Sequence, residues 1–254
     1  MRRVVFNQKG GVGKSSIAAN LAAISAERGY KTLLVDLDPQ CNSSQYLLGE
    51  AVNGVEKDAM DFFEQSLTFK IKSVSPREYV TETRFDNLSL LASNPNLGDL
   101  HAKLEAKHKI YKLREALDGL DDYAYIYIDT PPAFNFYTLS ALVAAQSCLI
   151  PFDCDEFSRQ ALYSLMENVQ ETVEDHNDQL HVEGIIINQF QPRATLPRQV
   201  VEQLKAEQLP VLSSYLSSSI KMKESHSQSL PLVHMAPKHK LTQEFMALFD
   251  ELHP

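Results

Sequence analysis

The sequence predicts an α/β protein in which a doubly wound, mostly parallel sheet is covered by helices on both faces. Two observations lead to this prediction. Short apolar runs alternate with stretches of helical periodicity, an order that is typical of strand–helix–strand units. Several runs, such as residues 124–128, show no polar alternation, which is typical of strands buried on both faces. We expect residues 1–254 to form a single domain.

The expected elements follow from β-forming runs and from apolar residues at helical spacing. The first helix, for example, places Ile17, Leu21 and Ile24 on one face and stops at Gly29. We expect strands at residues 4–6, 32–35, 88–91, 124–128, 148–150 and 182–187. We expect helices at residues 15–28, 97–117 with a break near Lys107, 136–146 and 160–175.

Three further segments differ from this alternation. Residues 50–87 are the least regular part and are interpreted as an irregular insertion with short helices of its own. Residues 213–229 are rich in serine and predict a surface loop with a short helix. Residues 237–252 predict an amphipathic helix, whose apolar face consists of Leu241, Phe245, Leu248, Phe249 and Leu252.

Composition excludes several classes of protein. The chain has 24 Lys and Arg against 33 Asp and Glu, a net charge of −9, so a uniformly basic surface for nucleic acid is excluded, although a local basic patch is not. The cysteines, Cys41, Cys148 and Cys154, have no zinc or disulfide spacing and predict reduced thiols in a cytoplasmic protein, with Cys148 and Cys154 buried. The sequence contains no run of about 18 apolar residues, so we expect no membrane span.

The strongest motif lies between the first expected strand and the first expected helix. Glycines let successive backbone N–H groups point into one concavity, and the helix N-terminus adds its positive dipole end, so the motif predicts a phosphate-binding loop. Lys14 is expected to reach the β- and γ-phosphates, and the Ser15 hydroxyl to bind Mg²⁺. Gln8 replaces the usual first glycine, which gives the deviant Walker A form. The motif consists of Lys9, Gly10, Gly11, Val12, Gly13, Lys14, Ser15 and Ser16.

Two acidic segments follow expected strands. Residues 36–40 read Asp-Leu-Asp-Pro-Gln, and residues 129–132 read Asp-Thr-Pro-Pro. In a doubly wound fold both strand ends can lie beside the phosphates, where a carboxylate holds Mg²⁺, usually through water. An aspartate at a strand end is by itself more often a helix cap. The order of the three motifs favours a nucleotide site.

With these motifs the sequence resembles the ParA/Soj branch of the deviant Walker A ATPases, a group that includes MinD. The similarity continues weakly through residues 184–188 to Glu224. It implies a P-loop ATPase that uses ATP and Mg²⁺, forms a homodimer around ATP and binds DNA without sequence preference. It also implies a ParB-like or other activating partner, a nucleoid-associated location, and a plasmid, chromosome or protein cluster as cargo.

The resemblance also implies roles for individual residues. Lys9 matches the signature lysine that crosses to the partner subunit's phosphates, beside Lys14 of the loop. Asp38 matches the residue that orients the attacking water, and Asp129 belongs to the segment that senses the γ-phosphate. Ser15, Asp38 and Asp129 are then the metal-binding residues. Asn188 is expected to recognise adenine.

The DNA surface is a weaker part of the resemblance. Arg193 and Lys221 match basic positions used for DNA, and Lys223 lies in the same region. Residues 217–219 are serines where relatives have Pro-Arg-Asn, so one expected arginine is missing. Ordinary solvated side chains are the alternative interpretation of these basic residues.

A second class of function stays open at this point, a membrane-associated regulator of the MinD type or a protein-only switch. The polar face of the expected C-terminal helix carries Glu244, Asp250 and Glu251 rather than a basic strip. A basic strip is typical of helices that lie on membranes. We therefore expect this helix to dock on the protein and expect no membrane partner.

Overall fold

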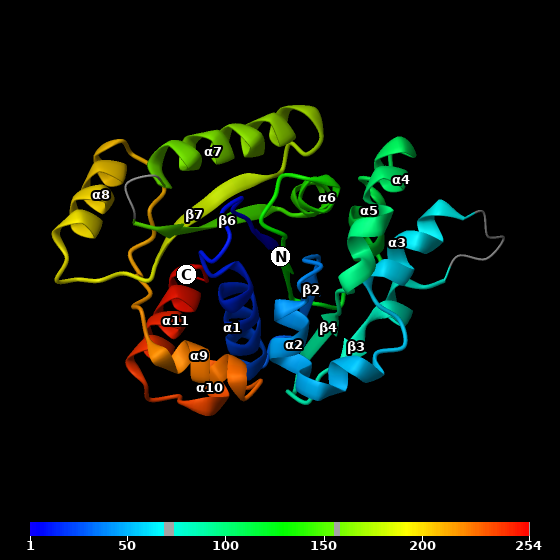
Figure 1. Ribbon diagram of the computed structural model, residues 1–254, viewed down its shortest axis with the longest axis horizontal. Coiled ribbons are helices and arrows are strands. Elements are labelled where there is room, and N and C mark those ends of the chain that lie inside the picture. Colours follow the sequence, from blue (N-terminus) through cyan, green and yellow to red (C-terminus); the bar gives the residue numbers. More distant parts are fainter. Residues whose placement is uncertain (69–73, 155–157, 254) are drawn as a thin grey trace.

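The computed structural model describes residues 1–68, 74–154 and 158–253. These residues form a seven-stranded sheet with helices on both faces (Figure 1). The strands are β1 (Arg2–Val5), β2 (Thr32–Asp36), β3 (Thr81–Glu82), β4 (Leu88–Leu91), β5 (Tyr125–Asp129), β6 (Ser147–Asp153) and β7 (His181–Asn188). Their order across the sheet is β3-β4-β2-β5-β1-β6-β7, and every pair is parallel except β3 with β4. The predicted fold class is confirmed.

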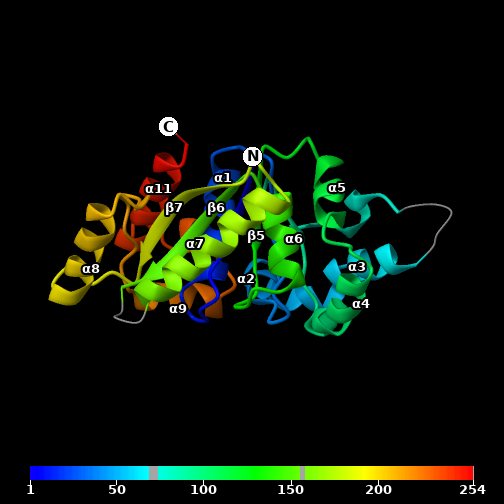
Figure 2. The same ribbon diagram turned by 90° about the horizontal axis from the view of Figure 1, so that it is seen from above.

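The helices form two layers. One face of the sheet is covered by α5 (Lys112–Asp118), α6 (Phe136–Ala144) and α7 (Ser158–Asp175), and the other by α1 (Lys14–Glu27) and α11 (Lys240–Glu251) (Figures 1 and 2). The remaining α-helices are α2 (Asn42–Leu48), α3 (Ala59–Leu67), α4 (His101–Ala106), α8 (Thr195–Ala206), α9 (Ile220–Ser227) and α10 (Leu232–Met235). Short 3₁₀ helices occur at Gly49–Gly54, Pro76–Tyr79 and Pro95–Leu100.

The strands alternate their side chains between two hydrophobic cores. Val4 belongs to the core under α6 and α7, whereas the next residue, Val5, belongs to the core under α1 and α11. Leu33 and Leu34 alternate in the same way on β2. Since successive side chains of a strand point to opposite faces, a strand that serves two cores must be apolar at every position. This is why the strand runs show no polar alternation.

Residues 50–87 contain short helices, as expected, but they also contribute a strand to the sheet. They contain α3, whose capping box joins Asp58 and Asp61, and β3, which pairs antiparallel with β4 and forms the sheet edge. Residues 69–73 of this segment lie outside the described residues. The sequence analysis missed β3 because two residues are too short for an alternation pattern.

The predicted helix at residues 97–117 is broken as expected. It consists of a 3₁₀ turn, α4 and α5, and the interruption includes His108, whose φ of 51° lies in the left-handed region. The short helix predicted within residues 213–229 is α9.

The C-terminal helix docks on the body of the protein, as predicted. Leu241, Phe245, Leu248 and Phe249 are buried in the core that contains α1. In the described part of the chain, no helix is long and apolar enough to cross a membrane.

Candidate functional site

The glycine-rich loop connects β1 to α1 in a left-handed backbone conformation. Gly11 has a φ of 78° and Gly13 a φ of 91°, a region that favours glycine because a Cβ would clash with the backbone. A Cβ at Gly13 would also lie 2.3 Å from the amide nitrogen of Asn188. The loop therefore needs glycine at Gly13 for two reasons, its backbone angle and the close approach of β7.

The two lysines of the loop differ in exposure. Lys14 is buried, and its ammonium group donates to the Lys9 carbonyl at 3.1 Å. Burial lowers the pKa of Lys14, whereas Asp129 and Asp38 raise it. Lys9 is exposed, and its backbone N–H is fixed by the side chain of Asn7 at 2.8 Å. Lys14 thus points into the loop, while Lys9 is exposed at the surface.

Two carboxylates lie side by side at the carboxyl ends of β2 and β5. Asp36 is the register partner of Asp129, and both are fully buried. Burial raises the pKa of Asp129 to about 6, although the hydroxyls of Ser15 and Ser43 oppose the shift. One oxygen of Asp129 accepts a hydrogen bond from Ser43 at 2.7 Å. Its other oxygen, Oδ1, is buried and accepts no hydrogen bond from the described residues.

The two aspartates at the end of β2, Asp36 and Asp38, lie in different environments. Asp36 accepts hydrogen bonds from the Ser44 hydroxyl at 2.7 Å and from the Ser44 and Asp38 backbone N–H groups at 2.9 and 3.1 Å. Burial and the neighbouring Asp129 raise the pKa of Asp36 to about 8. Asp38 accepts from the Gln40 backbone at 3.0 Å, and burial raises its pKa. Asp36 is therefore held inside the protein, while Asp38 faces the loop.

A hollow of about 350 Å³ opens beside the glycine loop. It is lined by residues of the loop, of the segment after β2 and of the turn after β5, so the structure brings these three motifs together. Asp129 Oδ1, which accepts no hydrogen bond from the described residues, and the Ser15 hydroxyl are oxygen ligands of the kind that a divalent cation takes, so the residues present fit Mg²⁺. The hollow is lined by Gly10, Gly11, Gly13, Lys14, Ser15, Ser16, Asp38, Gln40, Asn42, Pro132 and His226.

Asn188 lies on the other side of the loop, beside an adjoining hollow of about 200 Å³. Its side-chain amide donates to the Val12 carbonyl at 2.8 Å, so it supports the loop backbone directly. Ile17, Lys223 and Phe245 are among the residues that line the same hollow. A largely apolar hollow of this kind can hold a flat heterocycle. Adenine recognition by Asn188 stays a prediction.

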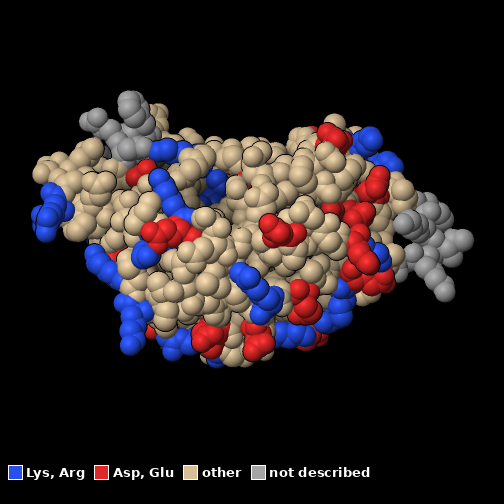
Figure 3. All heavy atoms as spheres, turned by 60° about the horizontal axis from the view of Figure 1, so that its bottom comes forward, with Lys and Arg blue, Asp and Glu red and all other residues tan. Residues whose placement is uncertain are grey.

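The residues predicted for DNA do not line the phosphate hollow, although Lys223 lines the adjoining hollow beside Asn188. Arg193 is exposed, in the loop before α8. Lys221 forms an ion pair with Glu224 on α9, and this pairing partly neutralises the charge that Lys221 could offer to DNA. Basic side chains gather on the side of the molecule that carries α8 and α11, and acidic side chains on the side of α3 and α5 (Figure 3). The charge is therefore unevenly distributed in spite of the net −9.

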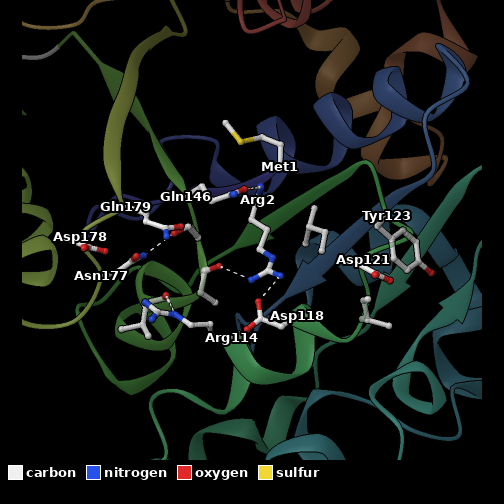
Figure 4. Close-up of a pocket in the computed structure, with 15 residues that line it drawn as sticks. Met1, Arg2, Arg114, Asp118, Asp121, Tyr123, Gln146, Asn177, Asp178 and Gln179 are labelled. Carbon is white, nitrogen blue, oxygen red and sulfur yellow. Dashed lines mark hydrogen bonds and ion pairs between the residues drawn. The ribbon is translucent and has the colours of Figure 1, made fainter.

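A further hollow of about 370 Å³ opens at the amino ends of the strands, the opposite edge of the sheet (Figure 4). Its cations are already engaged. Arg2 pairs with Asp118 at 2.7 Å, and Arg114 donates to the Val143 carbonyl at 2.7 Å. Its described lining contains no glycine loop. It is larger than the hollow at the glycine loop, but without such a loop and with its arginines engaged it is a poorer site for a phosphate.

Sequence reasoning gave no role to two residues of the site. Asp36 could have been found, since positions 36 and 38 lie at the same strand end. His226 had no such signal, because it reaches the loop from a helix 210 residues away in sequence. The three cysteines are buried, as was predicted for Cys148 and Cys154.

Comparison with known proteins identifies the family. Residues 3–182, more than half of the chain, match the protein family described as "AAA domain". The chain is 32% identical over 251 residues to the chromosome partitioning protein ParA of Myxococcus xanthus, which covers 98% of this chain and 86% of that protein. This chain belongs to the ParA/Soj family of partition and positioning ATPases.

A second relative agrees in sequence, and a solved structure agrees in fold. The sporulation initiation inhibitor protein Soj of Bacillus subtilis is 28% identical over 251 residues, which cover 98% of this chain and 96% of that protein. A crystal structure of a Mycobacterium smegmatis protein, named cobyrinic acid a,c-diamide synthase and bound to an ATP analogue and magnesium, superposes with a TM-score of 0.83. It is 25% identical and covers 98% of this chain and 92% of that one. ParA-type partition ATPases dimerise and act with partners.

Proposed function

We propose that this chain binds ATP with Mg²⁺ at the glycine loop, dimerises around the nucleotide and uses partner-stimulated hydrolysis to position a cargo. The observation that supports this most directly is the cluster of Lys14, Asp38 and Asp129 around a left-handed glycine loop. Backbone N–H groups and Lys14 supply the charge that a triphosphate needs. The α-helical N-terminus behind the loop adds its dipole.

Ser15, Asp38 and Asp129 are the residues that would hold Mg²⁺. The ion would neutralise charge between the β- and γ-phosphates. Asp129 Oδ1 supports this role because it is buried and accepts no hydrogen bond from the described residues. Asp38, whose pKa is raised by burial, is suited to orient a water molecule at the γ-phosphate.

Lys9 is the residue that would join two protomers. Its side chain is exposed at the surface, where a twofold-related copy can approach. A lysine donated across the interface adds positive charge at the γ-phosphate, as an arginine finger does in other phosphoryl-transfer enzymes. ATP is then part of the interface, and its hydrolysis releases the dimer.

The proposed partners of the dimer are non-specific DNA and a ParB-like or other activating protein. The basic side of the molecule, which carries Arg193, supports DNA, and a dimer doubles its charge. The acidic net charge favours weak binding that falls steeply with salt. DNA binding would place the protein on the nucleoid. The second candidate is a protein-only switch, which the ion pair of Lys221 with Glu224 favours.

The test uses the Asp38→Ala chain, in which hydrolysis is blocked. Light scattering after chromatography with ATP and Mg²⁺ should show a dimer, and Lys9→Ala in the same background should give a monomer that still binds nucleotide. Lys14→Ala should not bind nucleotide. A Lys9→Ala dimer, or full ATP affinity in Lys14→Ala, would contradict the proposal.

DNA binding is tested by cosedimentation of the Asp38→Ala dimer with random-sequence DNA and with anionic lipid vesicles. Retention on DNA at low salt, lost at high salt, is expected. Arg193→Ala should reduce retention without affecting dimerisation, whereas Lys103→Ala on α4, an exposed lysine at the other end of the molecule, should not. Retention on neither ligand would favour the protein-only switch, and retention on vesicles alone would favour a MinD-type regulator.

A further inference from the structure

His226 on α9 reaches the first turn of α1, next to the phosphate loop. Its Nε2 atom lies 2.8 Å from the hydroxyl oxygen of Ser16. The imidazole lines the same hollow as Lys14 and Ser15. None of the motifs of the sequence includes this histidine. Its contact with the loop depends on how α9 packs against α1.

The imidazole is held in place by its neighbours. It stacks on the ring of Tyr46, with ring centroids 4.0 Å apart and planes inclined by 18°. The Tyr46 hydroxyl hydrogen-bonds to Ser225, the residue before His226. Asn20 of α1 donates to the Ser16 carbonyl at 2.8 Å and to the Tyr46 hydroxyl at 3.2 Å. This buried network ties α1, α2 and α9 together around Ser16.

The hydrogen bond between His226 and Ser16 can run in two directions. Burial lowers the pKa of His226, so the ring is neutral at pH 7 and has a single N–H. Either Ser16 donates to Nε2, or Nε2–H donates to Ser16. A phosphate oxygen can only accept. Ser16 can therefore donate to a phosphate only when His226 is the donor to Ser16.

We propose that His226 is a positioning residue for nucleotide binding: its Nε2–H donates to the Ser16 hydroxyl, which then donates its hydrogen to a phosphate of ADP or ATP. No proton is transferred along this chain of hydrogen bonds. The inference rests on the proposed nucleotide site, and it adds a residue from α9 to that site. Because ADP and ATP share the phosphates nearest to α1, both nucleotides are affected alike.

The test measures the affinity of ADP with Mg²⁺ by calorimetry. Ser16→Ala should weaken binding about tenfold, which is 1.4 kcal/mol, since a hydrogen bond to a charged group is lost. His226→Leu should weaken binding to a similar extent. In the Ser16→Ala background, His226→Leu should have no further effect, because the histidine acts through that hydroxyl. Additive losses would overturn the proposal.

Conservative variants separate positioning from packing. The amide nitrogen of His226→Gln can occupy the place of Nε2 and should retain most of the affinity, whereas His226→Asn has a shorter side chain and should lose it. If His226→Leu does not fold, this pair of variants decides. Equal affinities of the Gln and Asn variants would overturn the proposal.

His234 on α10 provides the matched control. It also stacks on an aromatic ring, that of Phe85, with centroids 4.7 Å apart, but it is not in contact with the loop. His234→Leu should bind ADP like the wild type. If the wild type does not bind ADP, the proposed function fails. If the wild type binds and His226→Leu binds equally well, the inference about His226 alone fails.

Discussion

Arg3→Met is expected to be among the most destabilising substitutions outside the nucleotide site. The Arg3 guanidinium forms two hydrogen bonds of 2.8 Å to Glu183 on β7. It also donates to the Leu252 carbonyl at 2.7 Å and contacts His253 at 2.8 Å. The side chain of Arg3 is 3% exposed and that of Glu183 is 17% exposed. One residue of β1 thus connects β7 to the end of the C-terminal helix.

The magnitude follows from the burial of the pair. Removing one partner of a buried ion pair leaves the other charge uncompensated, which costs about 3–5 kcal/mol. For a chain of this size each kcal/mol lowers Tm by about 2–4 °C, so Tm should fall by about 6–20 °C. Replacing both residues, as in Arg3→Met with Glu183→Leu, should recover most of the loss, because no buried charge is left unpaired.

The pH dependence has a definite sign. Burial raises the pKa of Glu183, but hydrogen bonds from Arg3 and Ser147 outweigh burial and hold the pKa below its ordinary value. The pair therefore stabilises the protein above pH 4.5, and this contribution is lost as the pH falls through the pKa of the folded state. The stability difference between the wild type and Arg3→Met should shrink as the pH is lowered.

Urea unfolding followed by circular dichroism measures both effects. Arg28→Ala is the control, because Arg28 also joins the body to the C-terminal helix, through Asp250 at 3.3 Å, but the two side chains are 44% and 61% exposed. This exposed pair should contribute less than about 1 kcal/mol. If Arg3→Met is no more destabilising than Arg28→Ala, the reasoning about burial is refuted.

Three further predictions concern the loop, the acidic edge and the C-terminal helix. Gly13→Ala, whose Cβ would meet Asn188, should weaken ADP binding more than tenfold by calorimetry, whereas Gly54→Ala, with open space around it, should not. The pKa of Asp36 is raised from 3.8 to about 8, so between these pH values the folded, nucleotide-free protein keeps a proton that the unfolded chain has lost, and its stability falls as the pH rises. Asp36→Asn should make the free energy of unfolding, measured in urea, depend less on pH in this range. Phe245→Ala should cost about 3–5 kcal/mol in the same assay.

The sheet and the loop could be predicted because their signals are local. Each parallel strand contributes side chains to both hydrophobic cores, so its apolar run is continuous and easily recognised. The backbone angles at Gly11 and Gly13 are left-handed, a region that favours glycine, so the loop can be recognised by its glycines. The acidic residues at the ends of β2 and β5 came together because parallel strands end at one edge of the sheet.

The parts that could not be predicted depend on tertiary contacts. His226 joins the site through α9, and its immediate sequence gives no indication that a ring 210 residues from Ser16 will meet it. The edge strand β3 consists of two residues, and it exists because β4 provides a partner. Helix α8 has no side-chain N-cap, and Pro197 lies within it, so the usual signals of a helix start were absent.

The electrostatics of the acidic edge explain why nucleotide and cation should bind together. Asp36 and Asp129 are register partners and are fully buried, and besides burial the charge of Asp129 raises the pKa of Asp36. The hydrogen bonds from Ser44 support Asp36, whereas Asp129 keeps one oxygen without a hydrogen bond from the described residues. A triphosphate alone would add negative charge beside Asp129 and Asp38, which Lys14 alone cannot balance. A divalent cation would compensate these two carboxylates and the phosphates at once, so we expect the nucleotide and the cation to bind as a complex.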